Sequence, residues 1–171
     1  MPLTKTVQEV KEMLPTFISN LGSNTSLPNF DAFEAKYLLP LTGSALYTDI
    51  VTKYTNNNLS ESDTSLLKKM RLVAVAYAYH DVLALGHITL TDNGARKLLP
   101  NGATPVAKWE FEKVLSALHN TAIDATDVLL AYLFEQKPAA WTSAPEYSIL
   151  KKLLIKTGKD FSAIYTLHQP M

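Results

Sequence analysis

Hydrophobic residues recur at intervals of three and four along most of the chain, the spacing that places them on one face of an α-helix. The spacing between Thr6 and Glu9 is that of a capping box, in which the two side chains satisfy the first free amides of a helix. Pro15 ends or kinks the helix that follows, because proline lacks the amide hydrogen that a helix needs. The pattern therefore opens with one short amphipathic helix.

Two further short helices are predicted before residue 60. Asn29 is a suitable N-cap for the first of them, and Pro40 is expected to stop it. The second is expected to start at 42–44 and to end in the polar run 56–58, which consists of asparagine alone.

The strongest prediction is a central buried helix over about 60–86. Ser60 and Asp63 form a second capping-box pattern, and Gly86 provides the stop. The middle, 73–79, alternates large and small residues and can also be interpreted as a strand of period two. Helical flanks and several alanines favour helix, since alanine is a strong helix former and a poor strand former.

A small β-hairpin is predicted over 88–99, directly after the central helix. Residues 88–91 alternate β-favouring side chains, and Asn93-Gly94 tolerates the backbone angles of a tight turn. A second turn signal follows at 100–102. A single helical turn over 92–99 is the competing interpretation.

The second half again indicates helices. One is expected from Thr104-Pro105 to Gln136, and Pro138 forbids its continuation. More than 30 residues is long for a globular helix, so a break near 120–121 stays open as an alternative. Another is expected to start from the capping pair Ser143 and Glu146 and to end at Gly158.

These elements predict a mainly α fold, a helical bundle around the central helix with one small hairpin. The 171 residues suit a single helical domain, 1–171, because no repeat or linker divides the chain. The terminal segment becomes amphipathic again and stops at Met171, which suggests that the chain is the N-terminal part of a longer protein.

Composition narrows the possible functions. The chain has no cysteine, which excludes disulfides, thiolate nucleophiles and cysteine metal sites. Sixteen basic and sixteen acidic residues leave no net charge, which argues against a dedicated nucleic-acid binder. Neither a signal sequence nor an apolar run long enough for a membrane span is present, so we expect a soluble, cytoplasmic protein.

Candidate chemistry is sparse. His80 and His87 are about 10 Å apart along one predicted helix, too far to share a metal ion, and we interpret them as structural. His119 has Asp124 and Asp127 within two turns, which leaves an enzyme of unfamiliar design as a minor hypothesis. The six glycines are scattered singly and form no phosphate-binding loop. We therefore expect no enzymatic activity, no cofactor and no metal.

The aromatic residues are more informative than the titratable ones. Most of them are expected in the core; this set comprises Trp109, Tyr132, Trp141, Tyr147 and Tyr165. Trp141 lies between two prolines in an expected loop, where an indole packs either against a neighbouring helix or against a partner chain. Both interpretations of Trp141 stay open, with the core interpretation favoured.

Three segments together carry a resemblance to a known family. They are Phe33 to Tyr47 (FEAKYLLPLTGSALY), the end of the alanine-rich helix at Leu85-Gly86-His87, and Ile88 to Gly94 (ITLTDNG). In this order they resemble small helical proteins encoded in the structural-gene clusters of Bacteroidetes phages and prophages. Those proteins are similar in turn to the head–tail connector, or adaptor, proteins of tailed phages. The similarity covers residues 28–136.

The resemblance implies a non-enzymatic structural role. Copies would assemble into a ring or another homo-oligomer and contact other phage structural proteins, with the segment 88–102 projecting toward adjoining layers, so the protein would be a virion component. The candidate partner-interface residues are Ile88, Leu90, Asn93, Trp141 and Tyr165. The alternative from the residues alone is a helical module that binds an apolar ligand or peptide between its helices.

Overall fold

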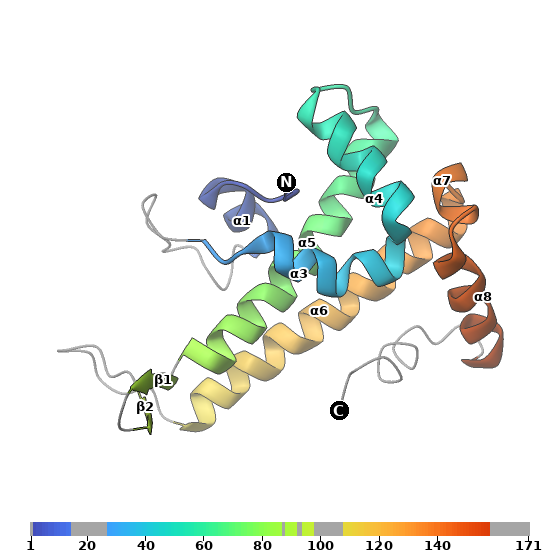
Figure 1. Cartoon of the computed structure of the whole chain (residues 1–171). Helices are drawn as coiled ribbons and strands as arrows, with labels where there is room; N and C mark the ends of the chain where they lie inside the picture. Colours follow the sequence, from blue (N-terminus) through green and yellow to red (C-terminus); the bar gives the residue numbers. More distant parts are fainter. Residues whose placement is uncertain (1, 15–26, 87, 92–93, 98–107, 158–171) are drawn as a thin grey trace.

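The computed structural model describes residues 2–14, 27–86, 88–91, 94–97 and 108–157 (Figure 1). Most of these residues are helical, so the predicted mainly α class is confirmed. In chain order the elements are α1 (Val7–Met13), α3 (Phe30–Tyr37), α4 (Leu39–Thr55), α5 (Glu61–Gly86), β1 (Ile88–Thr91), β2 (Gly94–Lys97), α6 (Lys108–Gln136), α7 (Ala139–Thr142) and α8 (Pro145–Thr157).

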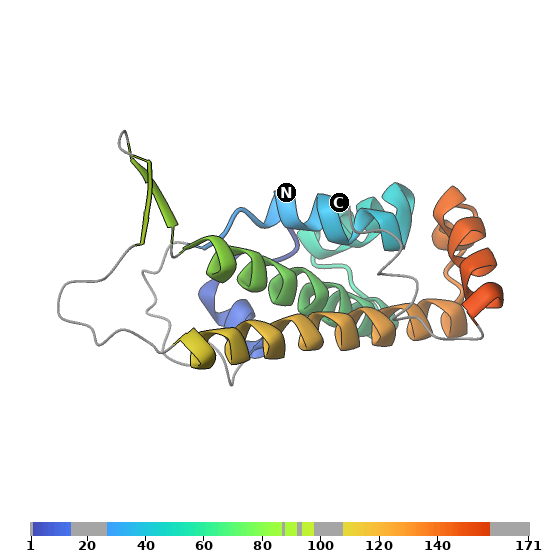
Figure 2. The ribbon, with the colours of Figure 1, turned by 90° about the horizontal axis from the view of Figure 1, so that it is seen from below.

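Two long antiparallel helices, α5 and α6, form the spine of the molecule (Figures 1 and 2). The expected central helix is α5, and its side chains from Val73 to Tyr79 are all buried. Alanines at 74, 76 and 78 let neighbouring helices approach closely, because a methyl group needs little space. The alternation at 73–79 therefore reflects burial on every side rather than a strand.

Shorter helices cover the spine on two sides. Helices α1 and α3 pack on α5, whereas α4 contacts α3, α7 and α8 (Figure 2). No helix among the described residues is long and apolar enough to cross a membrane. Among the described residues, the short helices thus cluster on part of the α5–α6 pair.

The pair β1 and β2 follows α5 directly. The strands run antiparallel, with Ile88 opposite Lys97 and Thr91 opposite Gly94. Both lie at the end of the molecule where α6 begins (Figure 1). Positions 92, 93, 98 and 99 of the predicted 88–99 hairpin, and the second turn signal at 100–102, are outside the described residues.

Two predicted helix starts are confirmed in atomic detail. The Thr6 hydroxyl accepts the Glu9 amide at 3.2 Å, and the Glu9 carboxylate accepts the Thr6 amide at 3.0 Å. Ser60 and Asp63 exchange the same two contacts at 3.1 Å each. Local sequence sets these boundaries because both partners of each cap lie within one turn.

The prediction that Pro40 stops a helix was wrong. Helix α3 already ends at Tyr37, and Pro40 lies in the first turn of α4, where its missing amide hydrogen leaves no helical bond unmade. The expected third helix is therefore the part of α4 beyond Gly43, whose positive φ of 71° bends α4.

Two points in the second half differ from the sequence prediction. Helix α6 passes through 120–121 without the break that was left open, and the hydroxyl of Thr121 donates to the Ala117 carbonyl within the helix at 2.9 Å. Ser143 does not cap α8; its hydroxyl donates to the Ala140 carbonyl and it closes α7 instead. The expected start of α6 at 104–105 and the stop at Gly158 lie outside the described residues.

Candidate functional site

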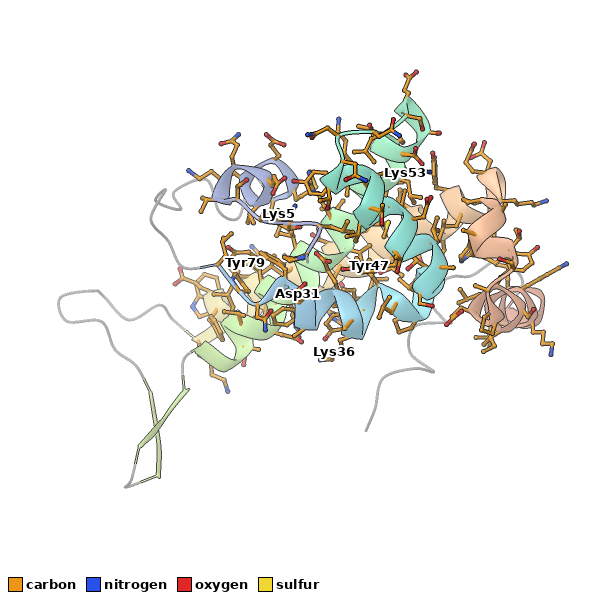
Figure 3. All side chains as sticks on the ribbon, turned by 45° about the horizontal axis from the view of Figure 1, so that its top comes forward. Lys5, Asp31, Lys36, Tyr47, Lys53 and Tyr79 are labelled. Carbon is orange, nitrogen blue, oxygen red and sulfur yellow. The ribbon has the colours of Figure 1, made fainter. Side chains whose placement is uncertain are left out.

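A buried carboxylate fixes the start of the chain. Glu34 of α3 has no exposed surface and accepts the Leu3 amide at both oxygens, at 2.9 and 3.0 Å. The hydroxyl of Tyr47 donates to the same carboxylate at 2.5 Å. Tyr47 belongs to α4 and is labelled in Figure 3. Burial raises the pKa of Glu34, and the hydrogen bonds from Tyr47 and the backbone oppose that effect. This carboxylate therefore has a structural role and is not accessible to a ligand from solvent.

Arg71 of α5 also binds the start of the chain, through Leu3 and Glu9. Its Nε donates to the Leu3 carbonyl at 2.8 Å, and its Nη2 pairs with Glu9 at 2.5 Å. The Tyr54 hydroxyl donates to the same Glu9 oxygen at 2.7 Å. Burial acts to raise the pKa of Glu9, but the Tyr54 hydrogen bond, backbone amides and Arg71 together hold it below its usual value. The charges of Arg71 and Glu9 therefore stabilise the packing of α1 on α5.

Asp81 near the end of α5 gathers three donors. The Tyr37 hydroxyl donates at 2.6 Å, the Lys36 ammonium at 3.0 Å, and Nδ1 of His80 lies 3.0 Å away. Burial acts to raise the pKa of Asp81, but the hydrogen bonds from these three donors outweigh burial, and the pKa lies below its usual value. The cluster ties α3 to α5, and its donors are already paired.

His119 belongs to this region rather than to a site with the acids of α6. Its ring packs against the His80 ring, with 5.1 Å between centroids. Asp124 and Asp127 follow five and eight residues later on a continuous helix, about 7 and 12 Å further along its axis. Within the described ranges, no three His, Asp or Glu side chains are placed to hold a metal ion. The suggested convergence of His119 with these acids is not observed.

The first ten residues of α6, 108–117, form an exposed arm. None of their side chains is buried, whereas buried positions recur from Leu118 onward. The Trp109 side chain is 65% exposed and Val114 is 41% exposed. A tryptophan with that exposure leaves a large apolar surface in water, and such surfaces often mark interaction sites.

The arm extends past the end of its neighbour. The contact between His80 and His119 sets the antiparallel register of α5 and α6. Because both helices rise by the same amount per residue, Gly86 at the end of α5 lies level with about residue 113. Trp109 therefore lies beyond the end of α5, where that helix cannot cover it.

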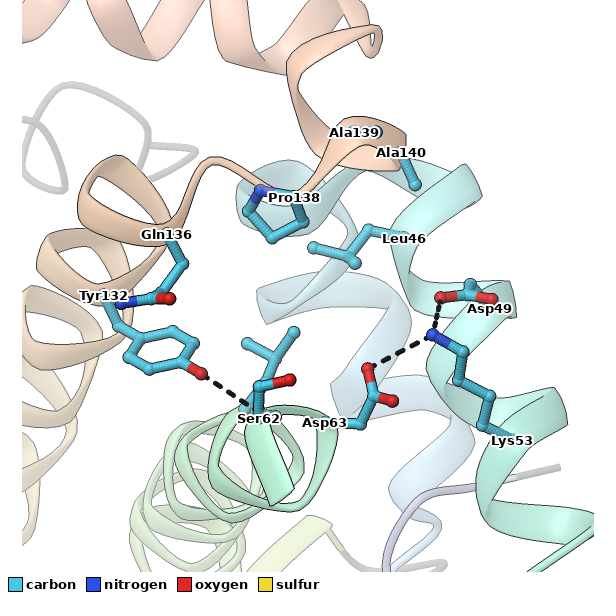
Figure 4. A pocket seen from close by; sticks show the side chains of 11 residues that line it. Leu46, Asp49, Lys53, Ser62, Asp63, Tyr132, Gln136, Pro138, Ala139 and Ala140 are labelled. Atoms are coloured by element: carbon cyan, nitrogen blue, oxygen red, sulfur yellow. Dashed lines mark hydrogen bonds and ion pairs between the residues drawn. The ribbon is translucent and has the colours of Figure 1, made fainter. Parts of the chain in front are cut away.

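A pocket of about 500 Å³ lies at the opposite end of the α5–α6 pair (Figure 4). Its lining comes from α4, α5, α6, α7 and the turn before α7. The apolar part includes Leu46, Leu66, Pro138, Ala139 and Ala140. The volume falls within the range of about 300–1,000 Å³ typical of ligand pockets.

One lysine joins two carboxylates at the pocket wall. Lys53 lies 2.8 Å from Asp49 and 3.2 Å from Asp63 (Figure 4). The hydrogen bond to Asp49 is the main reason that the pKa of Lys53 is raised. Two carboxylates and one ammonium leave this wall with one net negative charge. On the facing side, the Tyr132 hydroxyl donates to the Ser62 carbonyl at 3.1 Å.

The structure assigns the predicted interface residues to different places. Ile88 and Leu90 lie in β1, whose backbone alone is described, and Asn93 and Tyr165 are outside the described residues. Trp141 is fully buried in α7, so it has no surface for a partner, which corrects its inclusion. Its Nε1 donates to the Leu41 carbonyl at 2.9 Å, and Phe134 and Tyr147 pack edge-on at 4.9 Å each.

The exposed tryptophan is the one that sequence reasoning placed among the core candidates. Trp109 lies outside the apolar stripe of α6 and shares its face with Glu112, Lys113 and Ser116 at helical spacing. A large aromatic residue on an otherwise polar face is the signal that could have identified it.

Comparison with known proteins gives one match. A family of unknown function, DUF6712, matches residues 38–149. The chain belongs to this family. The match spans α4 to α7 and the start of α8, so the DUF6712 region includes both the arm and the pocket. No curated protein and no solved structure matches the chain.

Proposed function

We propose that this protein is a non-enzymatic assembly subunit, similar to a phage or prophage head–tail connector, that acts through protein–protein contacts. The resemblance of residues 28–136 to phage structural-cluster proteins supports the class of function. Its partners are further copies of itself and other phage structural proteins.

The exposed arm is the observation that carries the proposal. Trp109 is the largest exposed apolar side chain among the described residues, and tryptophan is enriched at the energetic centres of interfaces. Burial of an indole removes about 150–250 Å² from water, which is worth a few kcal/mol at about 25 cal/mol per Å². An assembly subunit needs such a surface, whereas an isolated domain gains nothing from it.

Net charge supports the same class of partner. Equal numbers of acidic and basic residues suit a protein that is surrounded mainly by protein. In such an assembly, affinity comes from apolar and aromatic side chains that symmetry repeats at each contact.

Self-association can be measured directly. Sedimentation velocity over a wide range of concentrations should show the wild-type mass rising above that of the monomer. Trp109→Ala should shift this rise to at least about tenfold higher concentration. Val128→Ala is the matched control, because Val128 is also exposed on α6 but lies outside the arm. A wild-type chain that stays monomeric at every concentration would count against the proposal.

The pocket supports a second candidate, a helical module that binds an apolar ligand or peptide. Its volume and mixed lining fit a small ligand. Native mass spectrometry would favour this candidate if a monomer carried a copurified ligand and Ala139→Trp, which fills the pocket, removed that ligand.

A further inference from the structure

We infer that the pocket receives the arm of a second copy of this chain. The inference rests on the proposed function and specifies its interface. In this contact the indole of Trp109 enters the apolar part of the pocket, and the ammonium of Lys108 meets the carboxylate of Asp49.

The contact cannot form within one chain. Trp109 and Tyr132 are 23 residues apart on one continuous helix, which separates them by about 35 Å along its axis. Because the arm and the pocket lie at opposite ends of α6, only a different molecule can bring them together.

Charge makes this pocket a suitable acceptor for the arm. Lys53 neutralises one of the two carboxylates beside it, and Asp49 is 43% exposed, so one negative charge faces solvent. Lys108 is 89% exposed beside Trp109 and pairs with Glu112 across 3.6 Å. An exposed pair of this length contributes little, so the ammonium is available to a partner carboxylate.

Shape supports the same pairing. The apolar lining comes from small or short side chains, Pro138, Ala139 and Ala140, which leave room for a flat aromatic ring. Leu46 and Leu66 form the remaining apolar lining. In the first turn of α6 the indole of Trp109 is followed by a polar helix face, which matches an apolar pocket with a charged wall.

A contact between two different surfaces has a consequence for symmetry. Reciprocal arm–pocket contacts related by a two-fold axis close a dimer, whereas one-way contacts repeat from copy to copy and give a closed ring or an open filament. In either symmetry the arm of one copy meets the pocket of another, and the arm does not meet a second arm.

The absence of cysteine allows a clean cross-linking experiment. Lys113→Cys marks the arm on the Trp109 face, and Gln136→Cys marks the pocket, where Gln136 is an exposed lining residue. Lys152→Cys on α8 is the control, because it is exposed and does not line the pocket. Each variant is purified separately, mixed in pairs and oxidised, and the products are identified by mass spectrometry.

The mixture of the arm and pocket variants should give disulfide-linked dimers at least about tenfold more abundantly than either variant alone or the arm–control mixture. Ala139→Trp should weaken self-association at least about tenfold by filling the pocket. Arm–arm products in excess, or equal cross-linking to the control, would overturn this inference while leaving self-association intact. A chain that never associates would overturn the proposed function as well.

Discussion

Glu34 and Leu3 are joined by two hydrogen bonds although 31 residues separate them in sequence. Both oxygens of the buried carboxylate accept the same backbone amide, at 2.9 and 3.0 Å. A charged acceptor without exposed surface is favourable only when donors replace the water that it has lost. The amide of Leu3 and the hydroxyl of Tyr47 are such donors, so the start of the chain is part of the fold.

Replacing the Glu34 carboxylate should destabilise the packing of residues 3–14 on the rest of the fold. Glu34→Gln keeps the shape but replaces one of the two oxygens that accept the Leu3 amide by an NH2 group, which cannot accept, so the unfolding free energy should fall by about 1–3 kcal/mol. Urea denaturation measures the loss, and amide exchange should accelerate first at residues 3–14. Glu12→Gln is the control; Glu12 is exposed on α1 and should change stability by less than about 0.5 kcal/mol. Equal effects of the two variants would contradict the role of Glu34.

The contacts that Glu9 makes with the Tyr54 hydroxyl, backbone amides and Arg71 should make stability depend on acid pH. The folded state holds the pKa of Glu9 below its ordinary 4.5, so its contribution is fully present above pH 4.5 and is lost as pH falls through the lowered value. Glu9→Gln lacks this contribution at every pH. The difference in unfolding free energy between wild type and Glu9→Gln should therefore be largest near pH 6–7 and should shrink below about pH 4.5. A constant difference would rule the linkage out.

For Glu34, the contribution to the unfolding free energy should change with pH in the direction opposite to that of Glu9. Burial raises its pKa in the folded state, so its contribution is present below pH 4.5 and is lost as pH rises through the raised value. Relative to Glu34→Gln, the wild type should become less stable as pH rises from 4.5 toward neutrality. Urea denaturation of both proteins over that interval measures the slope. A slope of the same sign as that of Glu9 would contradict the effect of burial.

The sequence predicts those parts of the fold that depend on residues within a few turns of one another. The first two capping pairs and the central helix are confirmed because each depends on residues within a few turns. Pro40 was misassigned because proline can occupy the first turn of a helix as well as end one, and local sequence does not distinguish the two. The Leu3 contact with Glu34 could not be predicted, since no local signal joins residues so far apart.

The candidate interface was predicted less well than the fold, as the two tryptophans show. Trp141 follows a proline in a turn that looks exposed, yet α4 and α6 close over it, as its bond to Leu41 shows. Trp109 belongs to a helix with an apolar stripe, yet α5 ends too early to cover it. Both outcomes depend on helix lengths and register, which are tertiary properties.

The bend of α4 at Gly43 should tolerate no side chain. Its φ of 71° disfavours any L-residue, and an added Cβ would lie 2.9 Å from both Ala144 and Glu146 of the next packed segment. Gly43→Ala should therefore destabilise the protein by more than about 1 kcal/mol, measured as a lower urea midpoint. Ser44→Ala is the control, because Ser44 is exposed beside the bend. Unchanged stability of Gly43→Ala would show that the bend is not fixed as described.

The two tryptophans should report separately on folding and on assembly. Trp141→Phe removes the hydrogen bond from the indole to the buried Leu41 carbonyl, so the unfolding free energy should fall by about 1–3 kcal/mol. In that variant Trp109 is the only indole, so at low concentration its emission should be red-shifted and readily quenched by acrylamide. As concentration rises, burial of Trp109 in a second copy should shift the emission to shorter wavelength and slow the quenching. Trp109→Phe, which retains only the buried Trp141, should show neither change; a concentration-dependent shift there would assign assembly to another surface.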